Sequence, residues 1–189
     1  MPTFIDRIRS VSRMRNLIRR ARTWYWKRWY GVAGVDISFL LNPGCDLASD
    51  FVAGPYGYMN SGCRISPRVR VGKYVMFGPD VMITGSDHHF DEPGVPINFS
   101  GRPELPQTLI GDDCWLGARC IIMAGIEIGR GSIIASGAIV TKSVEPYSVI
   151  AGVPARVIRK RFPTEEGEQI HDAMLAEPPH GGEFCEPKK

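Results

Sequence analysis

The sequence predicts an all-β chain wound as a parallel β-helix, and a repeat of six residues is the main reason. Read in blocks of six from Val35, nine successive blocks begin with an apolar residue, the last of them with Ile83. The register resumes at Ile110 and holds for six further blocks, the last of which begins with Val140. The fifth residue of nearly every block is small or apolar as well. A period of six does not fit an α-helix, and the region is rich in Gly, Val and Ile.

Each block is predicted to form a short strand followed by a corner. Positions five and one of successive blocks lie two residues apart, so their side chains share one face, which must be buried. Three such strands close one triangular coil of 18 residues, and fifteen blocks therefore predict about five coils. At roughly 4.8 Å a coil, the prism is about 24 Å tall. Position two often holds a residue that tolerates a positive φ, which we expect at the corners. These residues are Asp36, Asn42, Asn60, Gly72, Gly78, Gly111, Gly117 and Gly129.

The pattern divides the chain into three parts. Residues 1–34 form a basic amphipathic helix with an aromatic cap, residues 35–162 form the β-helix, and residues 163–189 form a helical or loose tail rich in Pro, Glu and Gly. The gap between the two runs of blocks is not a multiple of six. Residues 87–109 are therefore predicted to be a loop that leaves the coils, and loops on a rigid scaffold commonly carry function.

The N-terminal segment concentrates positive charge. Residues 1–30 hold nine Lys and Arg against one Asp, although the net charge of the whole chain is only +3. Apolar residues recur at steps of three and four from Phe4 to Ala21, which indicates a helix that leads into the aromatic and basic cluster Thr23–Tyr30. Two interpretations stay open: the apolar face caps the first coil, or the segment makes peripheral contact with a membrane surface. No nucleic-acid-binding motif accompanies the basic stretch, so nucleic acid is not expected as a partner.

The cysteines and the apolar runs limit the class of protein. Five cysteines are an odd number and include no CxxC pair, so neither a disulfide framework nor a zinc site is expected. The sequence has neither the apolar run that a secretion signal needs nor the longer apolar run that a membrane span needs. We therefore expect reduced thiols, a cytoplasmic location and no metal.

The block pattern resembles the hexapeptide-repeat acyltransferases over roughly residues 35–162. The most specific segments are IGDDCWLG, which begins at Ile110, and AGVPARVIR, which ends at Arg159. They are similar to the closing section of the branch that includes galactoside, maltose and streptogramin acetyltransferases. The resemblance implies a left-handed β-helix, a handedness that runs against the general preference of parallel crossovers. It also implies a homotrimer with active sites between neighbouring prisms and acetyl-CoA as cosubstrate.

The resemblance also implies a catalytic histidine. In the family this residue begins a His-x-x-Asp segment at the break of the repeat, and the segment from His88 to Asp91 fits, which favours His88 over His89. A neutral imidazole can take the proton of an acceptor hydroxyl while the oxygen attacks the thioester of acetyl-CoA. Asp87 and Asp91 either orient the ring and contact substrate or are solvated loop residues. The sequence does not identify the donor that stabilises the oxyanion.

Cofactor and acceptor contacts follow from the same resemblance. Basic side chains would meet the phosphates of coenzyme A, and backbone groups would receive its pantetheine arm. The implied cofactor contacts are Ala118, Ser136, Thr141, Lys142, Arg156 and Arg159. Trp115 lines the same groove or packs outside it, and Asn60 contacts the acceptor or only builds a corner. The loop, with Asn98, Arg102 and Glu104, is expected to form part of the acceptor pocket.

These expectations predict an acetyl-CoA-dependent O-acetyltransferase that acts on a sugar or a surface-polysaccharide precursor, with His88 as general base. Three alternatives remain: acetylation of an antibiotic of the streptogramin or chloramphenicol type, N-acetylation of an amino sugar, and a non-catalytic β-helix scaffold. A zinc hydratase on the same prism would need three spaced histidine ligands, whereas the repeat region offers only His88 and His89.

Overall fold

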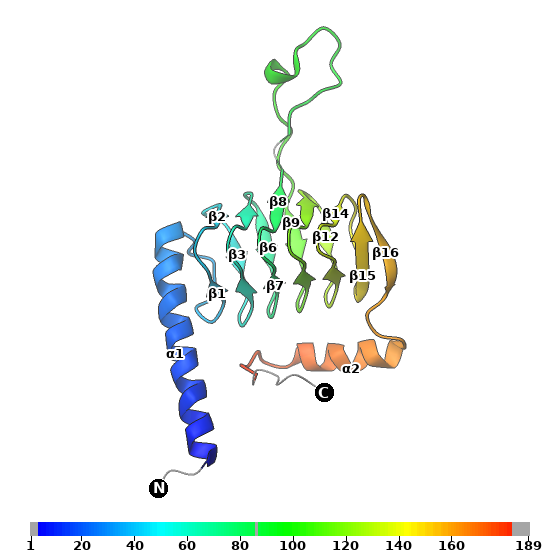
Figure 1. Ribbon diagram of the computed structural model, residues 1–189. Helices are drawn as coiled ribbons and strands as arrows, with labels where there is room; N and C mark the ends of the chain where they lie inside the picture. Colours follow the sequence, from blue (N-terminus) through cyan, green and yellow to red (C-terminus); the bar gives the residue numbers. More distant parts are fainter. Residues whose placement is uncertain (1–3, 86, 183–189) are drawn as a thin grey trace.

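The computed structural model describes residues 4–85 and 87–182, and within these ranges the side chains of residue 14 and of residue 16 onward. Its main body is a triangular prism of short parallel strands (Figure 1). The last part of the predicted tail, residues 183–189, and the side chains of residues 4–13 and 15 lie outside the described part. The predicted fold class, a left-handed β-helix with an N-terminal and a C-terminal helix, is confirmed.

Three sheets form the three sides of the prism. Sheet one contains β1 (Leu40–Leu41), β4 (Tyr58–Met59), β7 (Met76–Phe77), β10 (Trp115–Leu116), β13 (Ile133–Ile134), β15 (Ser148–Gly152) and β16 (Ala155–Lys160). Sheet two contains β2 (Asp46–Leu47), β5 (Arg64–Ile65), β8 (Met82–Thr84), β11 (Ile121–Met123) and β14 (Ile139–Val140). Sheet three contains β3 (Val52–Ala53), β6 (Val69–Val71), β9 (Thr108–Ile110) and β12 (Glu127–Ile128). The chain visits the sheets in this order, so each coil contributes one strand to each side.

The strand register shows the predicted coil length directly. Leu40 pairs with Tyr58 and Tyr58 with Met76, so successive partners along the sheet are separated by three blocks of the repeat. Met76 then pairs with Trp115, because the loop lies between them in the chain. The following pair, Trp115 and Ile133, returns to the spacing of three blocks. The loop therefore enlarges a single coil without disturbing the stack.

The core lies inside the prism and consists of the repeat positions. The apolar first residues of all fifteen blocks are at most 9% exposed. The fifth residues are buried too, apart from Cys45, which is half-buried, and Asp87, which is exposed in the loop. Two side chains per strand thus fill the interior, and a core made of stacked Val, Ile, Leu and Phe stabilises the coils through burial of apolar surface.

The expectation for the glycines at position two is wrong. Positive φ values occur at position four of the blocks instead, for example at Tyr74 (64°) and Arg119 (59°), whereas Gly72 and the other position-two residues have none. Gly72 is required for a different reason, which is the close approach of the next coil. A Cβ atom there would lie 2.8 Å from the backbone nitrogen of Asp112 and still closer to its carboxylate. Stacking distance, not backbone conformation, selects glycine at this position.

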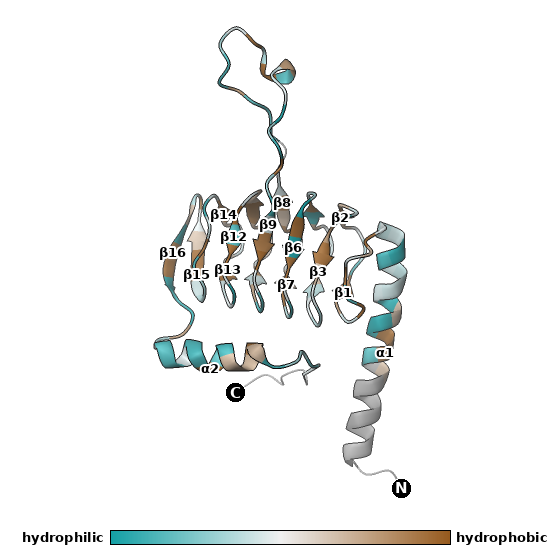
Figure 2. Ribbon diagram, turned by 180° about the vertical axis from the view of Figure 1, so that it is seen from behind, coloured by the Kyte–Doolittle hydropathy of each residue, from teal (hydrophilic) through white to brown (hydrophobic). Residues whose placement is uncertain are grey.

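Helix α1 (Phe4–Tyr30) lies across the end of the prism that β1 and β2 form (Figures 1 and 2). Thr23 Oγ1 donates to the carbonyl of Phe39 at 2.7 Å, and Arg19 Nε donates to the carbonyl of Ser38 at 2.8 Å. Lys27 Nζ donates to the carbonyl of Val35. Burial lowers the pKa of Arg19. The inner face of α1 therefore caps the first coil by supplying donors to carbonyl groups at its open end.

The opposite end is closed by β16, which pairs antiparallel with β15. Helix α2 (Glu165–Ala176) follows, with Thr164 as its N-cap, and lies along the prism (Figure 1). The carboxylate of Asp172 accepts from Arg130 Nε at 2.5 Å and from Arg130 Nη2 at 2.6 Å, and also from the hydroxyl of Tyr147. These contacts tie α2 to the last coils. Within the described ranges, no helix combines the length and the apolar character that a membrane span requires.

Candidate active site

The loop that interrupts the repeat leaves after β8 and returns at β9, and its two arms stand out from the prism (Figure 1). The backbone nitrogen of His89 donates to the carbonyl of Gly101 at 3.1 Å, and Ser100 Oγ donates to the carbonyl of His89. A short 3-10 helix, η1 (Ile97–Phe99), precedes the return arm. The outgoing arm with its two histidines is therefore held against residues 100–102.

His88 contacts Arg102 across these arms. Its ring is half-buried, and Arg102 Nε and Nη2 lie 3.3 Å and 3.2 Å from His88 Nε2. A guanidinium group has donors only, so Nε2 must be the acceptor, and a neutral ring then carries its proton on Nδ1. Nδ1 is buried and has no hydrogen-bond partner among the described residues. The arrangement leaves a lone pair on Nε2, the atom at which a general base would act.

The acidic residues that flank His88 do not contact it. Asp87 and Asp91 are both exposed, and neither forms a hydrogen bond to the ring within the part of the chain that the structure describes. The sequence analysis placed Arg102 in the loop without assigning it to His88. One signal was present, because Arg102 is the only Lys or Arg in residues 87–109.

The return arm is attached to the edge of the prism between sheets two and three, which we call the excursion edge. Arg68 Nη1 pairs with Glu104 at 2.6 Å, and the nitrogen of Gly125 donates to Thr108 Oγ1 at 3.0 Å. Thr141 and Lys142 follow β14 and are exposed on the same edge. They lie two coils from the strand where the loop begins, about 10 Å along the prism.

Three other predicted residues lie on a different edge, between sheets one and two. Asn60 follows β4, Ala118 follows β10 and Ser136 follows β13. The side chain of Asn60 donates to the carbonyl of Phe77 at 3.2 Å, as expected for a residue that builds a corner. A single chain therefore does not bring these residues together with His88.

The predicted basic contacts on β16 are accessible. Arg156 and Arg159 are exposed, and they pair through the backbone with Ala151 and Val149 of β15. Trp115, on β10 of the same sheet, is 48% exposed. These side chains thus offer positive charge and an aromatic surface on one side of the prism.

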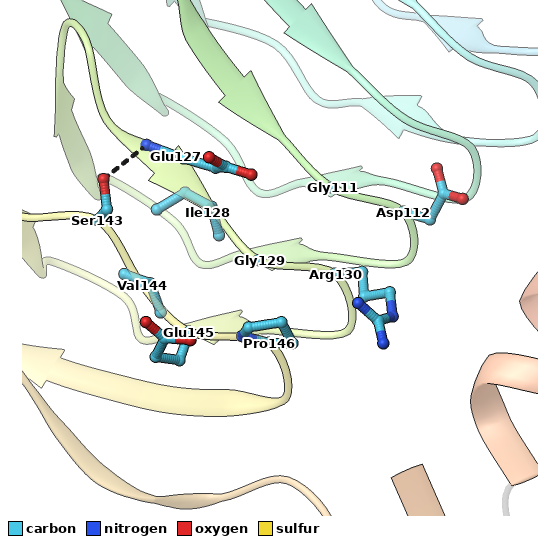
Figure 3. Close-up of a pocket in the computed structure, with 10 residues that line it drawn as sticks. All are labelled: Gly111, Asp112, Glu127, Ile128, Gly129, Arg130, Ser143, Val144, Glu145 and Pro146. Carbon is cyan, nitrogen blue, oxygen red and sulfur yellow. Dashed lines mark hydrogen bonds between the residues drawn. The ribbon is translucent and has the colours of Figure 1, made fainter. Parts of the chain in front are cut away.

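A hollow of about 500 Å³ opens on sheet three, along β12 and the segment that follows Lys142 (Figure 3). Its lining includes the carboxylates of Asp112, Glu127 and Glu145 together with Arg130. None of the predicted site residues lines it. The excess of carboxylates makes this hollow unsuited to a phosphorylated cofactor.

Two of the cysteines, Cys114 and Cys120, and His171 have structural surroundings. Burial raises the pKa of the Cys114 and Cys120 thiols to about 12, so both are neutral and poor nucleophiles at neutral pH. His171 Nε2 lies 2.8 Å from Asp113 Oδ2, in the contact between α2 and the prism. No group of three His, Cys, Asp or Glu among the described residues is placed to hold a metal ion. Of the two histidines on the loop, His88 is half-buried and contacts Arg102, whereas His89 is exposed.

Comparison with known proteins supports the same architecture. Residues 107–142 match a family model described as the hexapeptide repeat of succinyl-transferase. The chain is 43% identical over 82 residues to a chloramphenicol acetyltransferase of Escherichia coli, an alignment that covers 43% of this chain and 39% of the relative. It is 37% identical over 121 residues to a probable macrolide acetyltransferase of Lysinibacillus sphaericus, which covers 55% of this chain and 66% of the relative.

The solved structures extend the likeness beyond these segments. A galactoside acetyltransferase in complex with coenzyme A superposes with a TM-score of 0.63 at 28% sequence identity, over 72% of this chain and 68% of that chain. The chain spans less than two thirds of the length of the curated relatives named above. The chain thus carries hexapeptide repeats, and its resemblance to the acetyltransferases that share this left-handed β-helix is confirmed.

Proposed function

We propose that this chain is an acetyl-CoA-dependent O-acetyltransferase that acts on a hydroxyl of a sugar or a surface-polysaccharide precursor, with His88 as general base. One observation carries the proposal. The repeat is interrupted once, and the interruption holds a half-buried imidazole whose Nε2 accepts from Arg102. Removal of a proton from an acceptor requires a lone pair on a basic atom, and Nε2 of His88 provides one. The loop that holds His88 projects from a rigid prism (Figure 1).

The proposed role of His88 is proton transfer at Nε2. An acceptor hydroxyl replaces the Arg102 guanidinium, donates to Nε2 and loses its proton there as the oxygen becomes a nucleophile. Acetyl-CoA, when bound, supplies the acetyl group and a thiol leaving group. The protonated ring then returns the proton to the departing sulfur, which restores the neutral imidazole for the next cycle.

The proposed cofactor contacts require more than one copy of the chain. Thr141 and Lys142 share the excursion edge with His88, whereas Ala118 and Ser136 lie on the edge between sheets one and two, and Arg156 and Arg159 lie on β16. In two prisms packed side by side, the excursion edge of one chain would face the edge between sheets one and two of its neighbour. A homotrimer with the site between neighbours unites both sets, and the basic side chains then face the phosphates of coenzyme A.

The acceptor class has two candidates. The likeness to a galactoside acetyltransferase over most of the chain supports a sugar hydroxyl. The higher identity to chloramphenicol and macrolide acetyltransferases supports an antibiotic acceptor as the second candidate. In both cases Asn60 and the loop residues Asp87 and Asp91 are the proposed acceptor contacts.

The test uses the purified full chain with acetyl-CoA and a panel of sugars, nucleotide sugars, amino sugars and antibiotics. Free thiol release and product mass are followed, and coenzyme A binding is titrated in parallel. Acetylation of a sugar hydroxyl supports the proposal as stated, and acetylation of an antibiotic alone selects the second candidate. Transfer to an amine identifies an N-acetyltransferase, and the absence of both transfer and coenzyme A binding leaves a scaffold.

A further inference from the structure

Helix α1 has a second face that the prism does not use. Thr23 is fully buried against the first coil, and Met14 lies two and a half turns earlier and therefore on the opposite side of the helix. Five further large apolar residues share this outer side with Met14. The outer stripe, as we call it, consists of Met14 (57% exposed), Leu17 (64%), Ile18 (53%), Trp24 (62%), Tyr25 (51%) and Trp29 (70%).

The outer stripe is aliphatic toward its N-terminal end and aromatic toward its C-terminal end. From Met14 to Trp29 it extends about 22 Å along the helix at about 1.5 Å a residue. Tyr25 and Trp29 stack with ring centroids 6.5 Å apart, and a shallow apolar hollow lies among Trp24, Tyr25, Arg28 and Trp29. An exposed apolar patch of this extent marks an interaction site, and Trp and Tyr are the residues that favour a boundary between apolar and polar surroundings.

Cationic side chains accompany the stripe. Arg28 lies within it, and Arg20 and Arg22 lie along its two borders on the helical wheel; all three are exposed. Arg22 Nη2 donates to Asn42 Oδ1 of the first coil at 2.8 Å, so Arg20 and Arg28 are the cations that face outward. Among the residues that the structure describes, no ion pair joins α1 to a carboxylate. The cations of the inner face, Arg19 and Lys27, are instead directed at carbonyl groups of the first coil. The excess of positive charge on α1 is thus not balanced from within the described chain.

Charge decides between two occupants of the stripe. A second copy would bring its own nine Lys and Arg against the same set, with only one Asp in each segment, so like charges would face each other. A bilayer that contains anionic lipids offers apolar chains to the stripe and negative headgroups to the arginines at once. We propose that α1 lies on an anionic membrane surface, with the outer stripe at the headgroup boundary and Arg20 and Arg28 on the lipid phosphates.

This orientation is compatible with the rest of the molecule. Helix α1 lies at one end of the prism, whereas the loop with His88 emerges from its middle coils and projects in another direction (Figure 1). The prism would therefore stand on the membrane through its capped end, and the loop would stay accessible. The inference does not depend on the proposed reaction, since vesicle binding is measured without any substrate.

The test is flotation of the full chain with vesicles of phosphatidylcholine alone and of phosphatidylcholine with about one third phosphatidylglycerol. We expect binding to the anionic vesicles only, and a loss of about tenfold or more in partitioning when salt is raised from about 0.1 M to about 0.5 M. The double variant Trp24→Gln, Trp29→Gln should lower partitioning about tenfold or more, because the stripe loses both of its tryptophan side chains. Arg20→Gln with Arg28→Gln should bind less and depend less on salt.

A matched control removes two exposed aromatic residues elsewhere. Phe90 and Phe99 are 78% and 75% exposed on the loop, and the double variant Phe90→Gln, Phe99→Gln should bind vesicles like the wild type. The proposal would be overturned if the tryptophan variant bound anionic vesicles like the wild type, or if the loop variant lost binding. It would also be overturned if the wild type bound uncharged vesicles equally well, or bound no vesicles at all. Light scattering without vesicles measures the molecular mass of the wild type and of the tryptophan variant. A lower mass in the tryptophan variant would assign the stripe to self-association instead.

Discussion

The coils and the loop of residues 87–109 are built on different principles. In the coils, pairing partners recur every three blocks of the repeat, and each strand places the same two positions in the core. The loop inserts a long segment into one coil, and its Phe90 and Phe99 side chains are mostly exposed. Burial in the coils fixes the backbone so firmly that this insertion leaves the register intact. Stability therefore resides in the repeat, and the proposed chemistry resides where the repeat is broken.

The largest difference between the two regions is expected for the removal of an aromatic side chain. Phe77 is fully buried and meets Phe39 edge-to-face with ring centroids 6.4 Å apart. Phe77→Ala should lower the free energy of unfolding by about 3–5 kcal/mol, since it leaves a cavity between coils. Phe99→Ala, in the loop, should change it by about 0.5 kcal/mol or less. Urea denaturation of both variants checks this, and similar losses would show that the loop is part of the core.

Glycine substitution sharpens the same comparison. Gly72→Ala places a Cβ within 2.8 Å of the Asp112 backbone nitrogen, so the coils must separate, at a cost of about 1–3 kcal/mol. Gly94 in the loop has a φ of 84° and open space around it, and Gly94→Ala should cost only about 1 kcal/mol of backbone strain. Thermal unfolding of the pair provides the measurement. A larger loss at Gly94 would contradict the account of coil stacking.

Arg102→Ala tests the contact between Arg102 and the His88 ring and leaves the core unchanged. In the unliganded chain the guanidinium donor at Nε2 favours the neutral ring with its proton on Nδ1, so that Nε2 is ready to accept when the acceptor hydroxyl replaces Arg102. Without this donor, part of the neutral rings carry the proton on Nε2 and cannot accept there. We expect acetyl transfer to fall about tenfold while the unfolding free energy is unchanged within about 0.5 kcal/mol. Heteronuclear NMR of the His88 ring should show Nδ1 protonated in the neutral wild-type ring and a mixture in the variant. Arg102→Lys should restore part of the activity, whereas an unchanged tautomer in Arg102→Ala would contradict this role.

The smallest expected effect is the loss of stability at low pH that comes from the contact of Asp172 on α2 with the prism. Hydrogen bonds from Arg130 and then Tyr147 lower the pKa of Asp172 to about 2. The stabilisation is complete above the unfolded pKa of about 3.9 and is lost as the pH falls through about 2. Because the Asp172 side chain is 37% exposed, we expect about 1 kcal/mol or less. Denaturation curves between pH 5 and about pH 2 should show this acid-sensitive step in the wild type and not in Asp172→Asn, and an equal step in both would assign it to other groups.

The sequence was sufficient for the regular part because one period determines both strand position and burial. From Val35 to Val140, block-initial residues are buried as predicted, and the register breaks where the chain leaves the coils between β8 and β9, although residues 108 and 109 of the predicted loop belong to β9. The role of the position-two glycines was wrong, since the stacking distance between coils is not visible along one coil. The contact of Arg102 with His88 joins two arms of an irregular loop, and no periodicity reports such a pair. The docking of α2 through Asp172 and Tyr147 was missed for the same reason.

The most direct test of the central claim compares His88→Ala with its neighbour His89→Ala. Acetyl transfer, coenzyme A binding and unfolding free energy are measured for both variants and for the wild type. We predict that His88→Ala lowers the transfer rate by about 10²–10⁴-fold while it still folds and binds coenzyme A, and that His89→Ala stays within a few-fold of the wild type. A fully active His88→Ala would contradict the claim that the break in the repeat carries the catalytic base.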